Sequence, residues 1–166
     1  MVTLGQFNQL SQADAVTLLT PCVAIPAWVS ELVAGRPYAR RHQLLERAQL
    51  AASRWQQAEL QQALSAHPRI GEKPAGADEH HALSRQEQAG VDAANAPLAE
   101  ALRHENARYE AHFGHVFLIR ARGRSGEQML QELRRRLHNS PAQETAEALA
   151  QLSEITLIRL EGVISA

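Results

Sequence analysis

Helix start and stop signals recur along the whole chain and leave little room for an extended sheet. Ser11 and Ser125 each precede an apolar pattern of helical period, Pro26 suits a first helical turn, and Gly35 and Gly114 each follow the end of such a pattern. Serine is favoured at the N-cap, proline in the first turn and glycine after the last turn. The sequence therefore predicts a helix that starts at residue 84 and others over residues 12–19, 26–34, 38–66 with a break near 53, 97–113, 126–138 and 141–163.

The composition agrees with a helical domain. Apolar residues make up 45% of the 166 residues but aromatic residues only 4%, so the core must rest on aliphatic side chains that helices accept. We expect an all-α fold, a single-domain helical bundle of about seven to nine helices over residues 1–166. Residues 115–121 are the one extended-looking segment, which we expect to be irregular or packed against helices.

Charge and cysteine content exclude several classes of function. Seventeen Lys and Arg against eighteen Asp and Glu give a net charge of −1, so a nucleic-acid partner is not expected. The run from Arg134 to Arg136 is interpreted as a solvated helix face. Cys22 is the only cysteine, which excludes an internal disulfide, and a buried thiol is favoured over a nucleophile. No stretch is apolar enough to span a membrane, and we expect a cytoplasmic protein.

One loop gathers residue types that carry chemistry. Pro68 disfavours helical geometry at His67, so His67 is expected just past a helix end, at the mouth of a loop of roughly a dozen residues. Beyond the loop, Ser84, Glu87 and Gln88 stand at i, i+3 and i+4 and share one face of a first helical turn. Ser-x-x-Glu is also the capping-box pattern, in which both side chains only satisfy backbone N–H groups. The spacing alone leaves both interpretations open.

His67 could face Glu87 if the loop folds back. A carboxylate beside an imidazole favours the charged ring, orients it and selects its tautomer, which prepares a general acid or base. A zinc site built from His67, Glu79, His80 and His81 is disfavoured, because adjacent histidines point apart and no further ligand stands at a suitable spacing. The sequence therefore predicts no metal site.

Arg159 lies in an apolar stripe of the last predicted helix, with Leu152, Ile155 and Thr156 at helical spacings before it. A buried guanidinium needs an anion or several acceptors, because an unpaired buried charge is very costly. Two interpretations stay open. One is an internal salt bridge, with Glu154 or another helix, and the other is a bidentate contact to a substrate carboxylate or planar heterocycle.

The motifs "AHPRIGE" at 66–72 and "LSRQEQAG" at 83–90 resemble those of the 2-oxo-4-hydroxy-4-carboxy-5-ureidoimidazoline (OHCU) decarboxylases of urate degradation. Further segments follow in that family's order and spacing, namely "WVSELVAGRPY", "FGHVFLIRARGRS", "LQELRRRLHNS" and "ITLIRLEG". One departure is "GHVF", where relatives often have Gly-Phe-Pro-Phe, and it leaves open the role of His115 and its neighbours in the pocket.

The resemblance implies a homodimeric carboxy-lyase without metal or organic cofactor that converts OHCU to (S)-allantoin and CO2. It implies that His67 is the catalytic histidine and Glu87 its partner carboxylate. It also implies that Ser84 and Gln88 position the ring and ureido groups and that Arg159 binds the anionic substrate. The substrate contacts that it implies are Pro68, Ser84, Gln88, Phe117, Ile119 and Arg159, with the backbone of 117–119 lining the pocket.

Two alternatives remain at the level of sequence. A helical binding or scaffold domain without chemistry would use Ser84 and Glu87 only as a cap, and Arg159 only to bridge helices. A carboxy-lyase for a related heterocycle would keep the same site but change its lining near His115.

Overall fold

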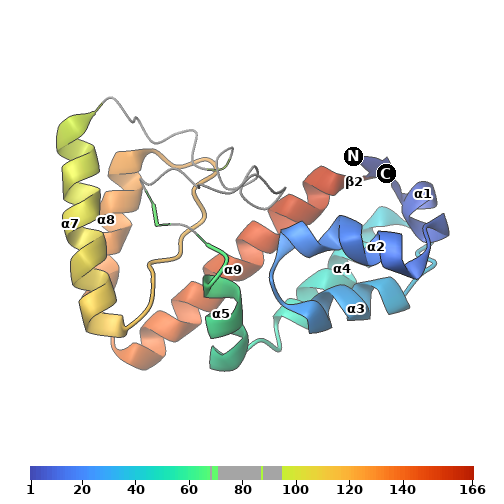
Figure 1. The fold of residues 1–166 in the computed structure, drawn as a ribbon, viewed down its shortest axis with the longest axis horizontal. Coiled ribbons are helices and arrows are strands. Elements are labelled where there is room, and N and C mark those ends of the chain that lie inside the picture. Colours follow the sequence, from blue (N-terminus) through green and yellow to red (C-terminus); the bar gives the residue numbers. More distant parts are fainter. Residues whose placement is uncertain (68, 71–86, 88–94) are drawn as a thin grey trace. The chain divides into compact units, whose positions relative to one another are not determined.

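The computed structural model of the chain describes residues 1–67, 69–70, 87 and 95–166, and these residues are mostly helical (Figure 1). The expected all-α class is confirmed. The described part contains eight α-helices and one 3-10 helix, and none of them is long and apolar enough to cross a membrane. The elements are β1 (Val2–Thr3), α1 (Leu4–Gln9), α2 (Gln12–Leu19), η1 (Thr20–Cys22), α3 (Pro26–Ala34), α4 (Arg41–Ala52), α5 (Gln57–Leu64), α7 (Ala96–Phe113), α8 (Gly126–Arg136), α9 (Pro141–Val163) and β2 (Ile164–Ser165).

The helix ends lie close to where the sequence signals placed them. Ser11 accepts a hydrogen bond from the backbone N–H of Asp14, and Ser125 forms a capping box with Gln128 at the start of α8. Gly114 ends α7 in the left-handed conformation, with φ of 80°, which costs glycine little because it has no Cβ. The expected break near residue 53 is confirmed, since α4 ends at Ala52 and α5 begins at Gln57.

The two ends of the chain carry elements that the sequence pattern did not predict. Thr3 caps α1 in a capping box with Gln6, and residues 2–3 pair in parallel with residues 164–165. A pair of two-residue strands is too short to stand alone. The two strands pair Val2 with Ile164. This pairing joins the two ends of the chain, and a pattern within a short stretch of sequence does not reveal it.

The chain divides into two compact units, and residues 1–63 with 153–166 form the first. Its core contains Phe7, Trp28, Leu32 and Leu44, all fully buried. The indole N–H of Trp28 donates to the carbonyl of Ala48 at 3.1 Å and so ties α3 to α4. Buried indole groups usually find such a partner, because an unmade hydrogen bond is costly. The lone thiol of Cys22 is buried in this unit, as predicted.

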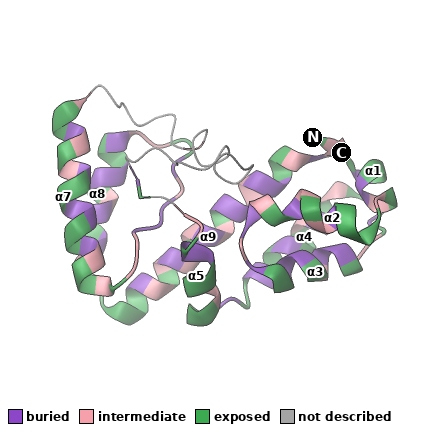
Figure 2. Cartoon of the chain, viewed as in Figure 1, coloured by how far each residue is buried: buried purple, intermediate pink, exposed green. Residues whose placement is uncertain are grey.

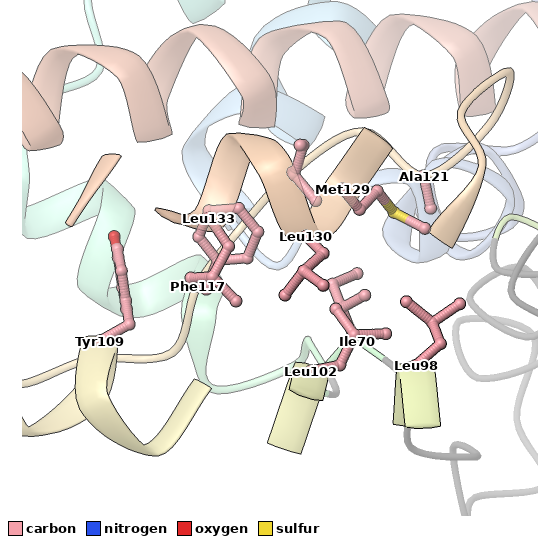
Figure 3. Packing of buried hydrophobic residues seen from close by; sticks show 10 residues of the cluster. Ile70, Leu98, Leu102, Tyr109, Phe117, Ala121, Met129, Leu130 and Leu133 are labelled. Carbon is pink, nitrogen blue, oxygen red and sulfur yellow. The ribbon is translucent and has the colours of Figure 1, made fainter. Parts of the chain in front are cut away.

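Residues 64–152 form the second unit, whose core lies between α7, α8 and residues 115–121. Figure 2 shows buried and exposed residues alternating along α7 and α8, as expected for helices that bury one stripe. Figure 3 shows the side chains that fill this core, among them Tyr109, Phe117 and Leu133, together with Ile70, Leu98 and Leu102. The segment 115–121 is irregular and packs against these helices, which confirms the expectation for it.

A buried ion pair and its hydrogen bonds join four parts of the second unit. The Nε of Arg136 donates to both carboxylate oxygens of Glu144, at 2.6 and 3.0 Å, and its Nη1 donates to the carbonyl of Leu118 at 2.8 Å. The guanidinium carbon lies 4.5 Å from the ring centre of Phe117, a cation–π distance. Tyr109 donates its hydroxyl to Glu144 at 2.9 Å. This network connects α7, α8, α9 and the segment 115–121 through charged groups that water does not reach.

The network corrects one sequence interpretation. Arg134 and Arg135 are exposed, as a solvated face requires, but Arg136 has only 2% of its surface exposed. Arg136 stands three positions after Leu133 and seven after Met129, both fully buried, so it faces inward with them. The charge run spans two faces of α8, because each residue advances the helix by about 100°, so that Arg134 and Arg136 lie on roughly opposite sides.

Replacing Glu144 with Gln should strongly destabilise the protein. The substitution keeps the shape but leaves the guanidinium of Arg136 buried without a counter-charge, which typically costs about 3–5 kcal/mol. Urea unfolding measures the change in free energy. The matched control is Glu147→Gln on the same helix, because Glu147 pairs with exposed Arg135 and should cost about 1 kcal/mol or less. Equal effects of both variants would contradict a structural role for the buried pair.

The two tyrosines should both resist ionisation in the folded protein. Burial raises the pKa of Tyr109, the charge of Glu144 raises it further, and Arg136 opposes both. Burial also raises the pKa of Tyr38, against the opposing charge of Arg47. Because the unfolded chain then loses phenol protons first, the free energy of unfolding should fall as the pH rises above about 10. Ultraviolet absorbance of the phenolate measures the titration, and a phenol that ionises near pH 10 in the folded protein would contradict this.

Candidate active site

His67 lies three residues past the end of α5, at the place predicted for it. Its backbone N–H donates to the carbonyl of Leu64 at 3.1 Å, which closes a final turn after the helix. The residue is half-buried, and its ring atom Nε2 is shielded from solvent. An imidazole with one ring nitrogen kept away from bulk water suits a group that exchanges a proton with a bound molecule.

The other residues expected around the loop are only partly within the described residues. Glu87 is helical and half-buried. Pro68, Ser84 and Gln88 lie outside the described residues, as do positions 79–81 of the disfavoured zinc site. Among the residues that the structure does describe, no group of three or more His, Cys, Asp or Glu side chains is placed to hold a metal ion.

Phe117 and Ile119 point their side chains into the core of the second unit. Their side chains are therefore taken up by the core, and a substrate contact through the backbone of 117–119 stays a prediction. The N–H of Arg120, the next residue, donates to Oε1 of Gln151 at 2.9 Å, and the guanidinium of Arg124 donates to the same oxygen at 2.8 Å. Gln151 on α9 thus holds the end of this segment in place.

Arg159 is buried, as its apolar stripe predicted, with 2% of its surface exposed. Its Nη1 donates to the carbonyl of Pro21 at 3.2 Å, across the first unit. The surrounding stripe of Leu152, Ile155 and Thr156 is also buried. Whether this guanidinium binds a substrate anion or serves an internal contact stays open, as it did from the sequence.

The predicted site residues are divided between the two units. His67, Glu87, Phe117 and Ile119 belong to residues 64–152, and Arg159 belongs to the first unit. That an imidazole, a carboxylate and a guanidinium from these positions meet in one cavity stays a prediction.

A cavity of about 350 Å³ opens beside the segment that follows His67. Its described lining comes from Arg69 and Ile70 and from one face of α7 that carries Arg103, Asn106 and Glu110. None of the described residues predicted for the site lines this cavity. The cavity therefore does not test the pocket that the sequence predicts.

Sequence reasoning missed the polar residues that hold these segments. Asn106 on α7, Arg136 on α8 and Glu144 on α9 are all buried, each in register with apolar neighbours of its helix. The argument that singled out Arg159, a polar side chain within an apolar stripe, applies equally to these three. Applied to every helix, it would have found them.

Comparison with known proteins gives a consistent result. The model of the family described as OHCU decarboxylase matches residues 8–161. The 2-oxo-4-hydroxy-4-carboxy-5-ureidoimidazoline decarboxylase of Amia calva is 31% identical over 97% of this chain and 94% of its own length. A uric acid degradation bifunctional protein of a Bacillus species is 24% identical over 98% of this chain, which spans about a third (32%) of that relative.

A solved structure shares the fold. The crystal structure of OHCU decarboxylase in the presence of (S)-allantoin superposes with a TM-score of 0.73. The match covers 87% of this chain and 94% of that one, at 24% sequence identity.

Proposed function

The chain belongs to the OHCU decarboxylase family, and from this premise we propose that it catalyses the decarboxylation of OHCU to (S)-allantoin and CO2 in urate degradation. The observation that carries the proposal is the family match over residues 8–161, together with 31% identity to a decarboxylase over nearly the whole chain. The position of His67 just past α5, with Nε2 shielded from solvent, supports it.

The chemistry needs positioned charges and one proton carrier. The bond between the ring carbon and the carboxylate breaks, CO2 leaves, and the electron pair passes into the conjugated C=N of the substrate. One proton then adds to carbon. Because the substrate itself accepts the electron pair, the reaction requires no bound electron sink, and the protein contributes by orienting the anion and moving protons.

We assign the roles residue by residue. His67 is the general acid or base, which removes the substrate hydroxyl proton or delivers a proton to carbon from one face. Glu87 orients its ring, and Arg159 binds the anionic substrate. Ser84 and Gln88 position the ring and ureido groups, beside Pro68 and the backbone of 117–119. Protonation from one face would set the handedness of the product. The enzyme acts as a cytoplasmic homodimer.

Removing the imidazole should abolish most of the activity while leaving the fold intact. His67→Ala is expected to lower turnover by about a hundredfold or more, which is the range of a positioned acid or base. Freshly generated OHCU is supplied, and circular dichroism follows the product, because spontaneous decay gives no chiral excess. His138→Ala, which removes an exposed histidine, is the control. Near-normal activity of His67→Ala would exclude the assigned role.

Removing the buried guanidinium should mainly weaken substrate binding. Arg159→Ala is expected to raise KM by about tenfold or more, since a hydrogen bond to a charged group contributes about 1.5–3 kcal/mol. Arg159→Lys keeps the positive charge but loses the planar guanidinium, which can donate two parallel hydrogen bonds. The KM of Arg159→Lys should therefore lie between those of the unaltered protein and of Arg159→Ala. Melting temperatures show whether the lost contact to Pro21 disturbs the fold. Unchanged KM and unchanged kcat in Arg159→Ala would refute the contact.

A further inference from the structure

The two described residues that follow His67 most closely are both tied to α7. The Nε of Arg69 forms an ion pair with Oε1 of Glu110 at 2.8 Å. The carbonyl of Ile70 accepts a hydrogen bond from the side-chain Nδ2 of Asn106 at 3.1 Å. Both contacts lie within the second unit, as does His67.

Asn106 and Glu110 stand four residues apart and therefore share one face of α7. Consecutive side chains on this face meet consecutive residues of the segment after His67. Asn106 has only 3% of its surface exposed, and the side chain of Ile70 is buried in the core beside Leu98 and Leu102 (Figure 3). The backbone at Ile70 is thus fixed by packing on one side and by an amide on the other.

The small free energy that these contacts contribute to folding indicates that they position the backbone more than they stabilise the fold. A partly exposed ion pair contributes about 0–1 kcal/mol to folding and a neutral hydrogen bond about 0.5–1.5 kcal/mol. Neither decides whether the chain folds. Both restrict the backbone two and three residues after His67, and a displacement of about 1 Å at a reacting group can cost about a hundredfold in rate.

We propose that Asn106 and Glu110 are positioning residues, which set the location of the His67 imidazole through Ile70 and Arg69. The inference rests on the proposed function, because it takes His67 as the proton carrier. Neither side chain is expected to contact the substrate. Loss of either contact should lower kcat and displace its pH dependence, while KM stays close to that of the unaltered protein. In the Glu110 variants the melting temperature should also stay close to that of the unaltered protein, because the ion pair is partly exposed.

The exposed pair on α7 supplies a matched test. Glu110→Gln removes the negative charge that pairs with Arg69, and Glu100→Gln removes the one that pairs with Arg103 on the same helix. We expect Glu110→Gln to lower kcat by about tenfold, within the range of displaced reacting groups, and Glu100→Gln to leave it unchanged. Exchanging the charges, as Arg69→Glu with Glu110→Arg, should restore part of the loss. Equal kcat and equal pH profiles in the two single variants would overturn the proposal.

Asn106→Asp tests the second contact. The shape is kept, but the Nδ2 donor becomes an oxygen that faces the carbonyl of Ile70, so kcat should fall at least as far as in Glu110→Gln. Because Asn106 is buried, the melting temperature of this variant is measured as well, and the Glu110 series decides the proposal where Asn106→Asp does not fold.

A spectroscopic measurement separates this inference from the proposed function. The ring resonances of His67 in isotope-labelled protein, assigned by their absence in His67→Ala, should shift in Glu110→Gln and remain in place in Glu100→Gln. An active His67→Ala enzyme would overturn both the assigned role of His67 and this inference. An inactive His67→Ala, with unchanged resonances and kcat in the Glu110 and Asn106 variants, would overturn the positioning role alone.

Discussion

The buried pair of Arg136 and Glu144 is the interaction on which the second unit depends. Burying two charges is costly, and attraction between them offsets the cost only where the remaining donors and acceptors are also satisfied. The carbonyl of Leu118, the ring of Phe117 and the hydroxyl of Tyr109 provide most of that satisfaction. As a result, one polar centre is shared by α7, α8, α9 and the segment 115–121. Displacing any of these elements would remove a hydrogen-bond or charge partner from a group that is buried in an apolar core.

This centre matters for the proposed site because it holds a segment that has no regular secondary structure of its own. Residues 115–121 have no strand partner among the described residues, so side chains hold them instead of a ladder of backbone bonds. Leu118 is held by Arg136, and Arg120 by Gln151. On the other side of the core, Asn106 and Glu110 hold the segment after His67. Helix α7 therefore serves both the core, through Tyr109, and the proposed site.

The predictions from sequence succeeded where the determinants are local. Serine caps, Pro26 and Gly114 fixed the helix ends to within a few residues, since each acts on the backbone within one turn. The burial of Arg159 and Cys22 also followed from local patterning. Arg136 was assigned to the wrong environment, because a run of three arginines was judged by its charge and not residue by residue around the helix. The pairing of β1 with β2 joins residues at opposite ends of the chain, and no local signal marks it.

The sequence alone determined that the chain is helical, that His67 stands past a helix end, and that Arg159 is a buried cation, because caps, proline geometry and helical period act over a few residues. It also carried the motifs that indicate the family. Only the tertiary structure decided which polar side chains meet. The partners of Arg136, Gln151 and Asn106 come from other segments of the chain. Such contacts depend on how helices pack against one another, and a pattern within one helix fixes which face is buried but not what that face will meet.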